Sequence, residues 1–402
     1  MKADLAQLNL WETTAPINVQ PAHPVVHTGD RFPISITPEI ATMLAQNAPV
    51  AIGVSGGKDS SAVAIRLVAY LKEIGYAGEV VLIHSDLGCI EWKESLPQCE
   101  RLAKRLGLEL IVTRRPSGDL MVRWEQRWEN CLTRYVDLSC VRLILPWSTP
   151  SMRFCTSELK TAQICSTLSK RFPKQPIISV TGIRHQESAS RAKLPCSMIQ
   201  PKLCRKDVTG YNWNPIITWS TPEVYEFLEM VNEPLHEAYT DFGLTRVSCC
   251  YCIMSSGPDL VAATQCEETH EVYRQIVALE ATSTFAFQGS RWLGDVAPHL
   301  LPPELRQKLI IAKEAAKVRA EAEKLIPKHL LYVKGWPTAI PSPDDAELIA
   351  QVRRRVAAAM GIQVNCTKAE SVRTRYAELM NLAAAKGGKG NVMNSDDFDL
   401  AA

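Results

Sequence analysis

The sequence predicts an α/β fold built on a parallel sheet and followed by a helical C-terminal extension. Three apolar runs suit buried strands, at residues 49–52, 80–84 and 109–113. Helix-like stretches lie between them, at 61–71 and 91–106, and the joins are short. Strands and helices that alternate across short joins form parallel sheets with right-handed crossovers. We therefore expect these three strands to share one parallel sheet.

The sequence beyond residue 113 predicts one further strand and several helices. Residues 117–170 are rich in tryptophan and indicate helices, and a fourth strand is predicted over 176–181. A helix is predicted over 219–231, because a Ser-Thr-Pro sequence in its first turn is a typical helix start. Residues 303–330 are rich in Ala, Glu, Lys and Arg and indicate a further helix.

Four segments are predicted along the chain of 402 residues. Residues 1–35 carry four prolines and indicate an extended arm. Residues 36–260 form the predicted α/β domain, and 261–386 form the helical extension. We expect the tail at 387–402, with its glycines and small acidic residues, to be disordered.

The most informative segment is the octapeptide Gly-Val-Ser-Gly-Gly-Lys-Asp-Ser at residues 53–60. It lies between the first predicted strand and the first predicted helix. Gly56 and Gly57 lack a Cβ, so the backbone can turn tightly and approach a ligand closely. Such a turn presents free N–H groups at a helix N-terminus, where an anion is favoured.

The polar side chains of this loop suit a pyrophosphate. Ser55 and Ser60 add hydroxyl donors, Lys58 adds positive charge, and Asp59 can hold Mg²⁺. The order of residues differs from the Walker A pattern, which requires Gly-x-x-x-x-Gly-Lys-Ser/Thr, and from the dinucleotide fingerprint. A glycine-rich turn without a ligand is the alternative interpretation.

Two further segments follow predicted strands and should face the same cleft, since ligands of parallel sheets bind beyond the carboxyl ends of the strands. Ser85 and Asp86 end the second strand. The fourth strand leads into Gly182, and beyond it Arg184 and Arg191 can clamp phosphates through their planar guanidinium groups. In the same segment, Glu187 can orient one of these arginines or hold the metal. A helix N-terminus with surface charges is the alternative.

The thirteen cysteines indicate metal, cluster or redox chemistry rather than disulfides, because no export signal is visible. Cys249 and Cys252 form a Cys-x-x-Cys pair that can grip one metal centre, Cys266 follows fourteen residues later, and Cys155 is a candidate for the fourth ligand. Thiolates without a nearby histidine suit an iron–sulfur cluster, which we favour over structural zinc and over a redox pair. Most of the other cysteines, Cys89 among them, are interpreted as small core residues.

Charge and hydropathy indicate the partners. Between Arg101 and Lys206 there are 20 Lys and Arg against 7 Asp and Glu, which favours a polyanionic partner such as nucleic acid. A solvated surface plus phosphate-binding arginines is the alternative. No apolar run has the length of a membrane span, and the N-terminus lacks a signal-peptide core. We expect a cytoplasmic protein with no membrane partner.

Taken together, these segments resemble a known family, the phosphoadenosine-phosphosulfate-reductase-like branch of the PP-loop ATP pyrophosphatases. The resemblance covers residues 48–255. It implies an adenine-nucleotide α-hydrolase-like core, of the Rossmann-like HUP class, in which Ser85 and Ile183 flank the adenosine. The matched pieces, in chain order, are Ser55–Ser60, His84–Asp86, Cys155–Lys160, Gly182–Ser188 and Arg246–Cys252.

Within this family the chain looks most like the ATP-pyrophosphatase subunit of bacterial DNA phosphorothioation systems of the Dnd and Ssp types, which serve in phage defence. The resemblance implies cleavage of ATP to AMP and pyrophosphate with Mg²⁺, which activates a nucleic-acid backbone phosphate for sulfur insertion. It also implies a [4Fe-4S] cluster, a cysteine desulfurase as sulfur donor, and other subunits of a modification complex. DNA is the favoured nucleic acid.

Three alternatives stay open. A reductase of phosphoadenosine phosphosulfate would carry a mobile C-terminal cysteine, whereas the last cysteine here is Cys366. Cluster-bearing reductases also use an adjacent cysteine pair where this chain has Cys155 and Thr156. The other two alternatives are a tRNA sulfurtransferase and a regulatory protein that binds ATP or nucleic acid without catalysis.

Overall fold

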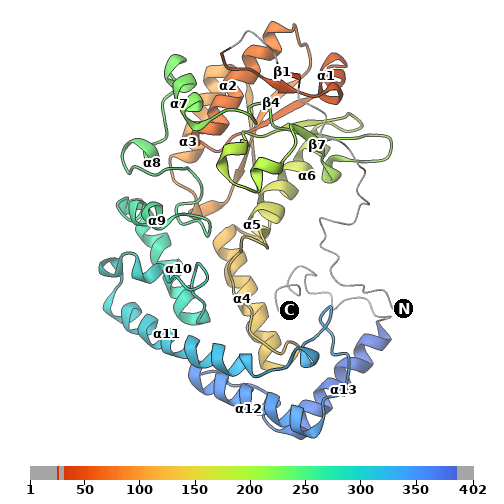
Figure 1. Cartoon of the computed structure of the whole chain (residues 1–402), viewed down its shortest axis with the longest axis vertical. Coiled ribbons are helices and arrows are strands. Elements are labelled where there is room, and N and C mark those ends of the chain that lie inside the picture. The colour runs from red at the N-terminus through yellow and green to blue at the C-terminus, as the bar shows by residue number, and fades with distance from the viewer. Residues whose placement is uncertain (1–24, 27–30, 387–402) are drawn as a thin grey trace. The chain divides into compact units, whose positions relative to one another are not determined.

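The computed structural model describes residues 25–26 and 31–386 (Figure 1). Its main sheet has six strands in the order β5-β4-β3-β6-β8-β7. A separate two-stranded ribbon pairs β1 (Val25–Val26) with β2 (Ser35–Ile36). The strands of the main sheet are β3 (Val50–Gly53), β4 (Val80–Asp86), β5 (Glu109–Arg114), β6 (Ile178–Val180), β7 (Ser197–Ile199) and β8 (Tyr211–Trp213).

The centre of this sheet is parallel, which confirms the predicted fold class. In the register of β3, Gly53 aligns with Ile83 of β4 and Ile52 aligns with Val180 of β6. The pairing of β6 with β8 is also parallel, and the edge strand β7 runs antiparallel to β8. The carboxyl ends of β3, β4 and β6 therefore lie at one edge of the sheet, where a ligand of such a fold binds.

The residues divide into two compact units, and each unit is built from several stretches of chain. Among the described residues, the first unit contains those up to His84, with 98–111 and 164–235. The second contains 85–97, 112–163 and 236–386. The predicted boundaries at 35 and 260 stay predictions, and most of the predicted arm and the whole predicted tail lie outside the described residues.

The first unit carries most of the sheet. Its helices are α1 (Pro38–Ala45), α2 (Lys58–Glu73), α3 (Ser95–Leu106), α6 (Ala162–Arg171) and α7 (Thr221–Met230). The first residues of α3 and α6 belong to the second unit. Apolar side chains of β3 and α2 form its main core, and Trp213 and Trp219 are buried in it.

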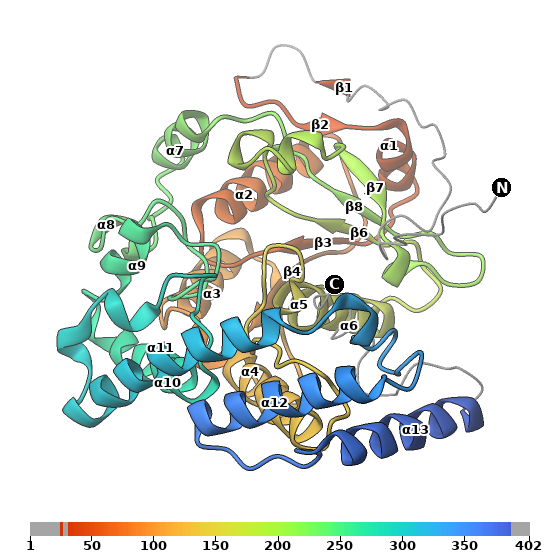
Figure 2. The same cartoon turned by 60° about the horizontal axis from the view of Figure 1, so that its bottom comes forward.

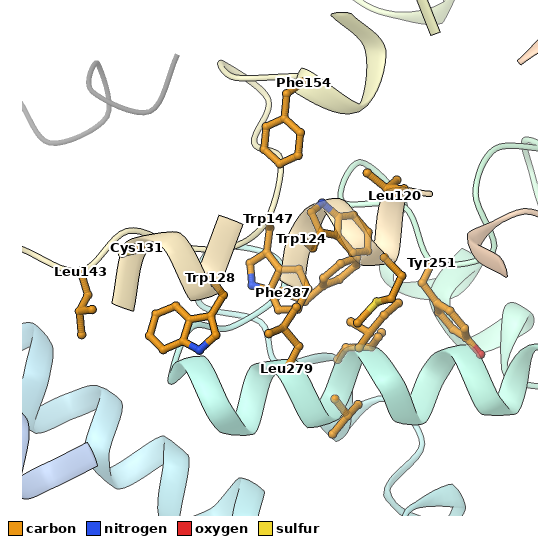
Figure 3. Packing of buried hydrophobic residues seen from close by; sticks show 14 of the residues in the cluster. Leu120, Trp124, Trp128, Cys131, Leu143, Trp147, Phe154, Tyr251, Leu279 and Phe287 are labelled. Atoms are coloured by element: carbon orange, nitrogen blue, oxygen red, sulfur yellow. The ribbon is translucent and has the colours of Figure 1, made fainter. Parts of the chain in front are cut away.

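The second unit is mainly helical. Its helices are α4 (Leu120–Val136), the short α5 (Phe154–Thr156), α8 (Glu237–Thr240), α9 (Gly257–Ala263), α10 (His270–Ser283), α11 (Pro303–Lys324), α12 (Pro343–Met360) and α13 (Ala369–Ala385). Helices α10 to α13 pack in chain order, each on the next (Figure 2). Trp124, Trp147 and Phe287 meet edge to face in its core, with ring centroids 5.1 to 5.8 Å apart (Figure 3).

Two sequence-based expectations can be checked at this level. Cys99, Cys131, Cys140 and Cys165 are buried as predicted, but Cys89 is exposed, because it lies in the short 3₁₀ turn η1 (Gly88–Ile90) rather than in a helix that packs on the core. Within the described residues, no helix combines the length and the apolar character that crossing a membrane requires.

Candidate functional site

The turn between β3 and α2 has the backbone that a phosphate-binding loop needs. Gly56 has a φ of +73°, in the left-handed region that favours glycine. Gly57 precedes α2 in an extended conformation and provides no side-chain cap. The 16-residue helix therefore begins with no side-chain cap on its N–H groups, which favours an anion, and the one acidic residue of its first turn is Asp59.

The two serines of the loop hold its shape. The backbone N–H of Ser55 donates to Oγ of Ser60 over 3.2 Å, and the two hydroxyl oxygens are 3.3 Å apart. The hydroxyl of Ser60 donates to the carbonyl of Gly57 over 2.8 Å. These contacts connect Ser55 at the start of the loop with Ser60 at its end, and Gly56 and Gly57 lie between them.

A charged network lies at the start of α2. Asp59 accepts a hydrogen bond from Nε of Arg184 over 2.7 Å, and its other oxygen is 3.3 Å from Nζ of Lys58. Lys58 is 5% exposed and lies over the ring of Tyr225, 5.7 Å from the centroid. The carboxylate of Asp59 is 21% exposed, so it is the most accessible of these three charged groups.

Arg184 is buried and fully engaged inside the first unit. It is 2% exposed. Beyond its bond to Asp59, Nη1 donates to the carbonyl of Trp219 and Nη2 to the hydroxyl of Thr221, both over 3.2 Å. Each guanidinium nitrogen therefore has a protein partner. In this structure Arg184 orients Asp59, and its predicted clamp on phosphate stays a prediction.

Gly182 explains how the segment after β6 comes so close to the loop. A Cβ on Gly182 would lie 2.6 Å from the carbonyl oxygen of Asp59 and 3.2 Å from the nitrogen of Ser60. A side chain would therefore push the first turn of α2 away. The next residue, Ile183, is partly buried and packs against the core of the first unit.

Glu187 connects the two predicted arginines. One of its oxygens accepts the backbone N–H of Arg184 over 2.9 Å, and the other forms an ion pair with Arg191. Arg191 is about one-third exposed, which leaves it more accessible than Arg184. Five residues predicted from the sequence, Asp59, Gly182, Arg184, Glu187 and Arg191, are thus joined by contacts within one unit.

Ser85 and Asp86 end β4 and belong to the second unit. The hydroxyl of Ser85 donates to the carbonyl of Leu159 over 2.7 Å. Asp86 accepts the N–H of Gly88 and Nε of Arg114, both over 2.7 Å. Both side chains are thus occupied within their own unit, and the expectation that they share a cleft with the loop stays a prediction.

The thiols of the predicted cluster lie in the second unit. Burial is the main cause that raises the pKa of Cys249 above its usual range, and the nearby thiols of Cys252 and Cys155 raise it further. Lys160 acts in the opposite direction. Cys155 precedes a π-helical turn, η2 (Ser157–Thr161), of the kind found at functional sites. Cys155, Cys249 and Cys252 therefore share one electrostatic environment.

Cys266 has charged neighbours that differ from those of Cys249. Its electrostatic neighbours are Glu237 and Glu268, and it also influences the buried thiol of Cys250. It lines an open cleft of about 510 Å³ whose other walls are formed by Lys93, Glu94, Pro97, Glu237, Phe242, Gln265, Glu267 and Glu268. Its predicted role as a cluster ligand stays a prediction.

The donor chemistry fits a sulfur-ligated metal, but the ligands are not drawn together. Three partly exposed thiols are the soft donors that iron–sulfur clusters and structural zinc both use. Across residues 25–26 and 31–386, no three Cys, His, Asp or Glu side chains are placed to hold one metal ion.

Several contacts of the site carry no sequence signal. Tyr225, Thr221 and the carbonyl of Trp219 hold Lys58 and Arg184 from α7 and the residues before it. The sequence indicates Thr221 only as part of a helix start and gives no sign of its bond to Arg184. Arg114 gives no signal either, because it is one basic residue among many in this part of the chain.

The family model for the phosphoadenosine phosphosulfate reductase domain matches residues 49–255, more than half of the chain. The chain therefore belongs to this family, which is named for an enzyme of sulfur chemistry on a nucleotide. No curated protein matches the sequence.

Three solved structures are similar to parts of the chain. FMN adenylyltransferase from Candida glabrata, in complex with FMN and the ATP analogue AMPCPP, is 19% identical over 52% of this chain, with a TM-score of 0.35. The chain spans little more than half of that protein, 56%. Phosphoadenylyl-sulfate reductase from Candida auris, in a phosphate complex, is 13% identical over 52% of this chain and 86% of its own, with a TM-score of 0.34.

The third is the U34-tRNA thiolase NcsA from Methanococcus maripaludis with its [4Fe-4S] cluster. It is 15% identical over 64% of this chain and 83% of its own, with a TM-score of 0.33. At these TM-scores the likenesses carry no argument about the chemistry of this chain.

Proposed function

We propose that the protein cleaves ATP to AMP and pyrophosphate and uses the adenylyl group to activate a nucleic-acid backbone phosphate for sulfur insertion, as in bacterial DNA phosphorothioation. The observation that carries this proposal is the Ser55–Ser60 loop, which joins a buried parallel strand to an uncapped helix N-terminus. Such a turn binds the β and γ phosphates through backbone N–H groups. Family membership agrees with chemistry on an adenine nucleotide that involves sulfur.

The loop and two arginines have distinct parts in this proposal. Arg184 and Arg191 lie on either side of the short 3₁₀ helix η3 (His185–Glu187). Backbone N–H groups of the loop hold the pyrophosphate as the α–β bond breaks, where fixed donors aimed at developing charge are most effective. Arg191 is accessible enough to neutralise the leaving group. Arg184 holds Asp59 in place. A nonbridging oxygen of the acceptor phosphodiester attacks the α phosphorus, pyrophosphate leaves, and sulfur later displaces AMP.

Two further components belong to the proposal. Asp59 would hold Mg²⁺, which offsets phosphate charge. Cys155, Cys249 and Cys252 would hold an iron–sulfur cluster, which would supply a group that binds sulfur. The sulfur would come from a cysteine desulfurase as a persulfide, which a two-electron reductant would bring to the sulfide level before it displaces AMP. We also propose that the protein acts together with other subunits of a modification complex.

The test is an anaerobic assay with α-labelled ATP and Mg²⁺, with and without duplex DNA, that resolves AMP from ADP and detects pyrophosphate. We expect AMP and pyrophosphate in equal amounts, with turnover raised by DNA. Asp59→Asn, which keeps a side-chain oxygen for Nε of Arg184, should abolish pyrophosphate release while the protein stays folded. The control is Asp241→Ala, which removes an exposed carboxylate of the second unit. Full activity of the Asp59 variant would remove the metal assignment.

A second candidate is a sulfonucleotide reductase, which the description of the family favours. This reaction needs a mobile thiol. Cys366 is partly buried in the join between α12 and α13, where Arg353 donates to the carbonyl of Asn365 beside it. Thiol-dependent release of sulfite from phosphoadenosine phosphosulfate, without turnover of ATP, would put this candidate first. Stimulation by tRNA alone would indicate a tRNA sulfurtransferase, and ATP binding without turnover a regulatory protein.

A further inference from the structure

Many arginines in the middle of the chain are used inside the protein, so they add little to its accessible positive charge. Arg123 pairs with Glu158, Arg171 with Glu79 and Glu109, and Arg184 with Asp59. Arg134 and Arg142 donate to backbone carbonyls. The net charge of this region is therefore larger than the positive charge that its arginines offer to a partner.

One part of the first unit keeps its charge on the surface. From residue 164 to residue 222 the chain has only two acidic residues, Glu187 and Asp207. Glu187 is engaged with Arg191, which leaves Asp207 as the remaining acid of this stretch. Acidic side chains normally neutralise surface lysines, and the two acids that reach the end of α6 from elsewhere, Glu79 and Glu109, pair with Arg171 and not with a lysine.

Arg205 connects two segments of this stretch, the turn in which it lies and the C-terminal end of α6 with the residues that follow. Its Nη1 donates to the carbonyl of Ser169 over 3.0 Å, and Nη2 donates to the carbonyls of Phe172 and Gln175 over 3.3 and 3.1 Å. The turn around Arg205 is thereby fixed on the C-terminal end of α6. The short 3₁₀ helix η5 (Pro201–Leu203) leads into this turn, and Gln200 accepts the N–H of Lys202 at its start.

Four exposed lysines project from these two segments: Lys170 and Lys174 from the end of α6, and Lys202 and Lys206 from η5 and the turn. We call these four the lysine face. The ammonium group of Lys202 acts on the thiol of Cys165 in α6, which agrees with the two segments being adjacent. In the described part of the chain, Lys170, Lys174 and Lys206 form no ion pair. Helix α6 packs on the sheet through Cys165 and Leu168, which contact residues of β3 and β4.

We propose that the lysine face binds the phosphodiester backbone of a nucleic acid. Four flexible ammonium groups on a surface fixed by Arg205 suit a row of phosphates and read no base sequence. This proposal rests on the proposed function, since it gives the nucleic-acid substrate a place to dock. It differs from the ATP site, because none of the four lysines belongs to the Ser55–Ser60 loop or contacts Arg184.

The test is binding of a fluorescent duplex DNA, without ATP, at a series of salt concentrations, followed by anisotropy. The variant carries Lys170→Gln, Lys174→Gln, Lys202→Gln and Lys206→Gln. Each phosphate contact contributes about 0.9 to the slope of log affinity against log salt, so the slope should fall by up to roughly 3.6. The matched control replaces four exposed lysines of the second unit, Lys308, Lys324, Lys328 and Lys334, by Gln.

A reduced slope in the first variant, with a wild-type slope in the control and unchanged thermal unfolding in both, supports the proposal. Equal losses in the two variants overturn it, because net charge and not the face would then be responsible. A wild-type slope in the first variant overturns it as well. A single-stranded RNA of the same sequence is the second arm and identifies which nucleic acid binds more tightly. Because ATP is absent, failure of the ATP assay leaves this result intact, and the reverse also holds.

Discussion

Asp59 lies between two cations, and this position determines what each of the three side chains can do. Arg184 is 2% exposed and Lys58 is 5% exposed, so both charges depend on the carboxylate for compensation. A buried charge without a partner is costly, whereas an intact pair is close to neutral in its effect on stability. Asp59 therefore has a structural part as well as its proposed part in Mg²⁺ binding.

Arg184→Met should destabilise the protein by about 3 kcal/mol, since it leaves Asp59 with Lys58 alone and breaks the bonds to Trp219 and Thr221. Urea unfolding measures this free energy. The control is Arg191→Met, which removes a partly exposed ion pair and should cost about 0 to 1 kcal/mol. Equal effects of the two substitutions would contradict the positioning role of Arg184.

Gly182→Ala tests the close approach to the loop. The new Cβ would meet backbone atoms of Asp59, which cannot move aside as a flexible side chain can. We expect a loss of about 1 to 3 kcal/mol in stability and a large loss of ATP turnover, because the first turn of α2 shifts. Gly257→Ala is the matched control, since its Cβ would meet only the side chain of Arg291, at 3.5 Å. An active, stable Gly182 variant would show that the loop tolerates displacement.

At the scale of elements, one carboxylate organises the segment that follows α10. Glu280 is fully buried and accepts N–H groups from Phe287 and Leu293 on one oxygen and from Gly294 on the other, over 2.7 to 3.0 Å. The side chain of Glu280 thus accepts three backbone N–H groups that would otherwise need backbone carbonyls as acceptors. Burial raises the pKa of Glu280 to about 7, although the three N–H groups lower it.

This raised pKa predicts a pH dependence of stability. The folded state keeps the proton of Glu280 up to about pH 7, whereas the unfolded state releases it near the ordinary glutamate pKa of 4.5. Stability from this group is thus present at low pH and falls as the pH rises from about 4.5 to 7, by roughly 3 kcal/mol. Unfolding free energies of the wild type and Glu280→Gln should differ in slope over this range. Parallel curves would contradict the assignment.

At the scale of the whole molecule, the predictions that succeeded rest on contiguous residues. The strand ending at Gly53 and the helix that follows it were predicted, because eight adjacent residues specify the turn between them. The strands β7 and β8 were missed, since each has three residues and no clear alternation. The bond from Arg184 to Thr221 spans 37 residues of sequence, so no local pattern could reveal it.

The interleaving of the two units predicts how truncation acts. A fragment of residues 31–260 keeps α4 but loses Phe287, which covers both Trp124 and Trp147. We expect this fragment to expose its tryptophans, with red-shifted emission and binding of a hydrophobic dye, whereas a fragment of residues 31–386 should not. Native-like emission from the shorter fragment would show that the helical extension is dispensable for this core.

The same interleaving constrains the order in which the chain can fold as it is synthesised. Trp92 stacks on Phe242 within the second unit, with ring centroids 5.8 Å apart, so it must wait for about 150 further residues to leave the ribosome. The first unit, in contrast, has all of its chain once Leu235 has emerged. The Ser55–Ser60 loop therefore has the chain of its own unit available before the unit that carries Cys155, Cys249 and Cys252 is complete.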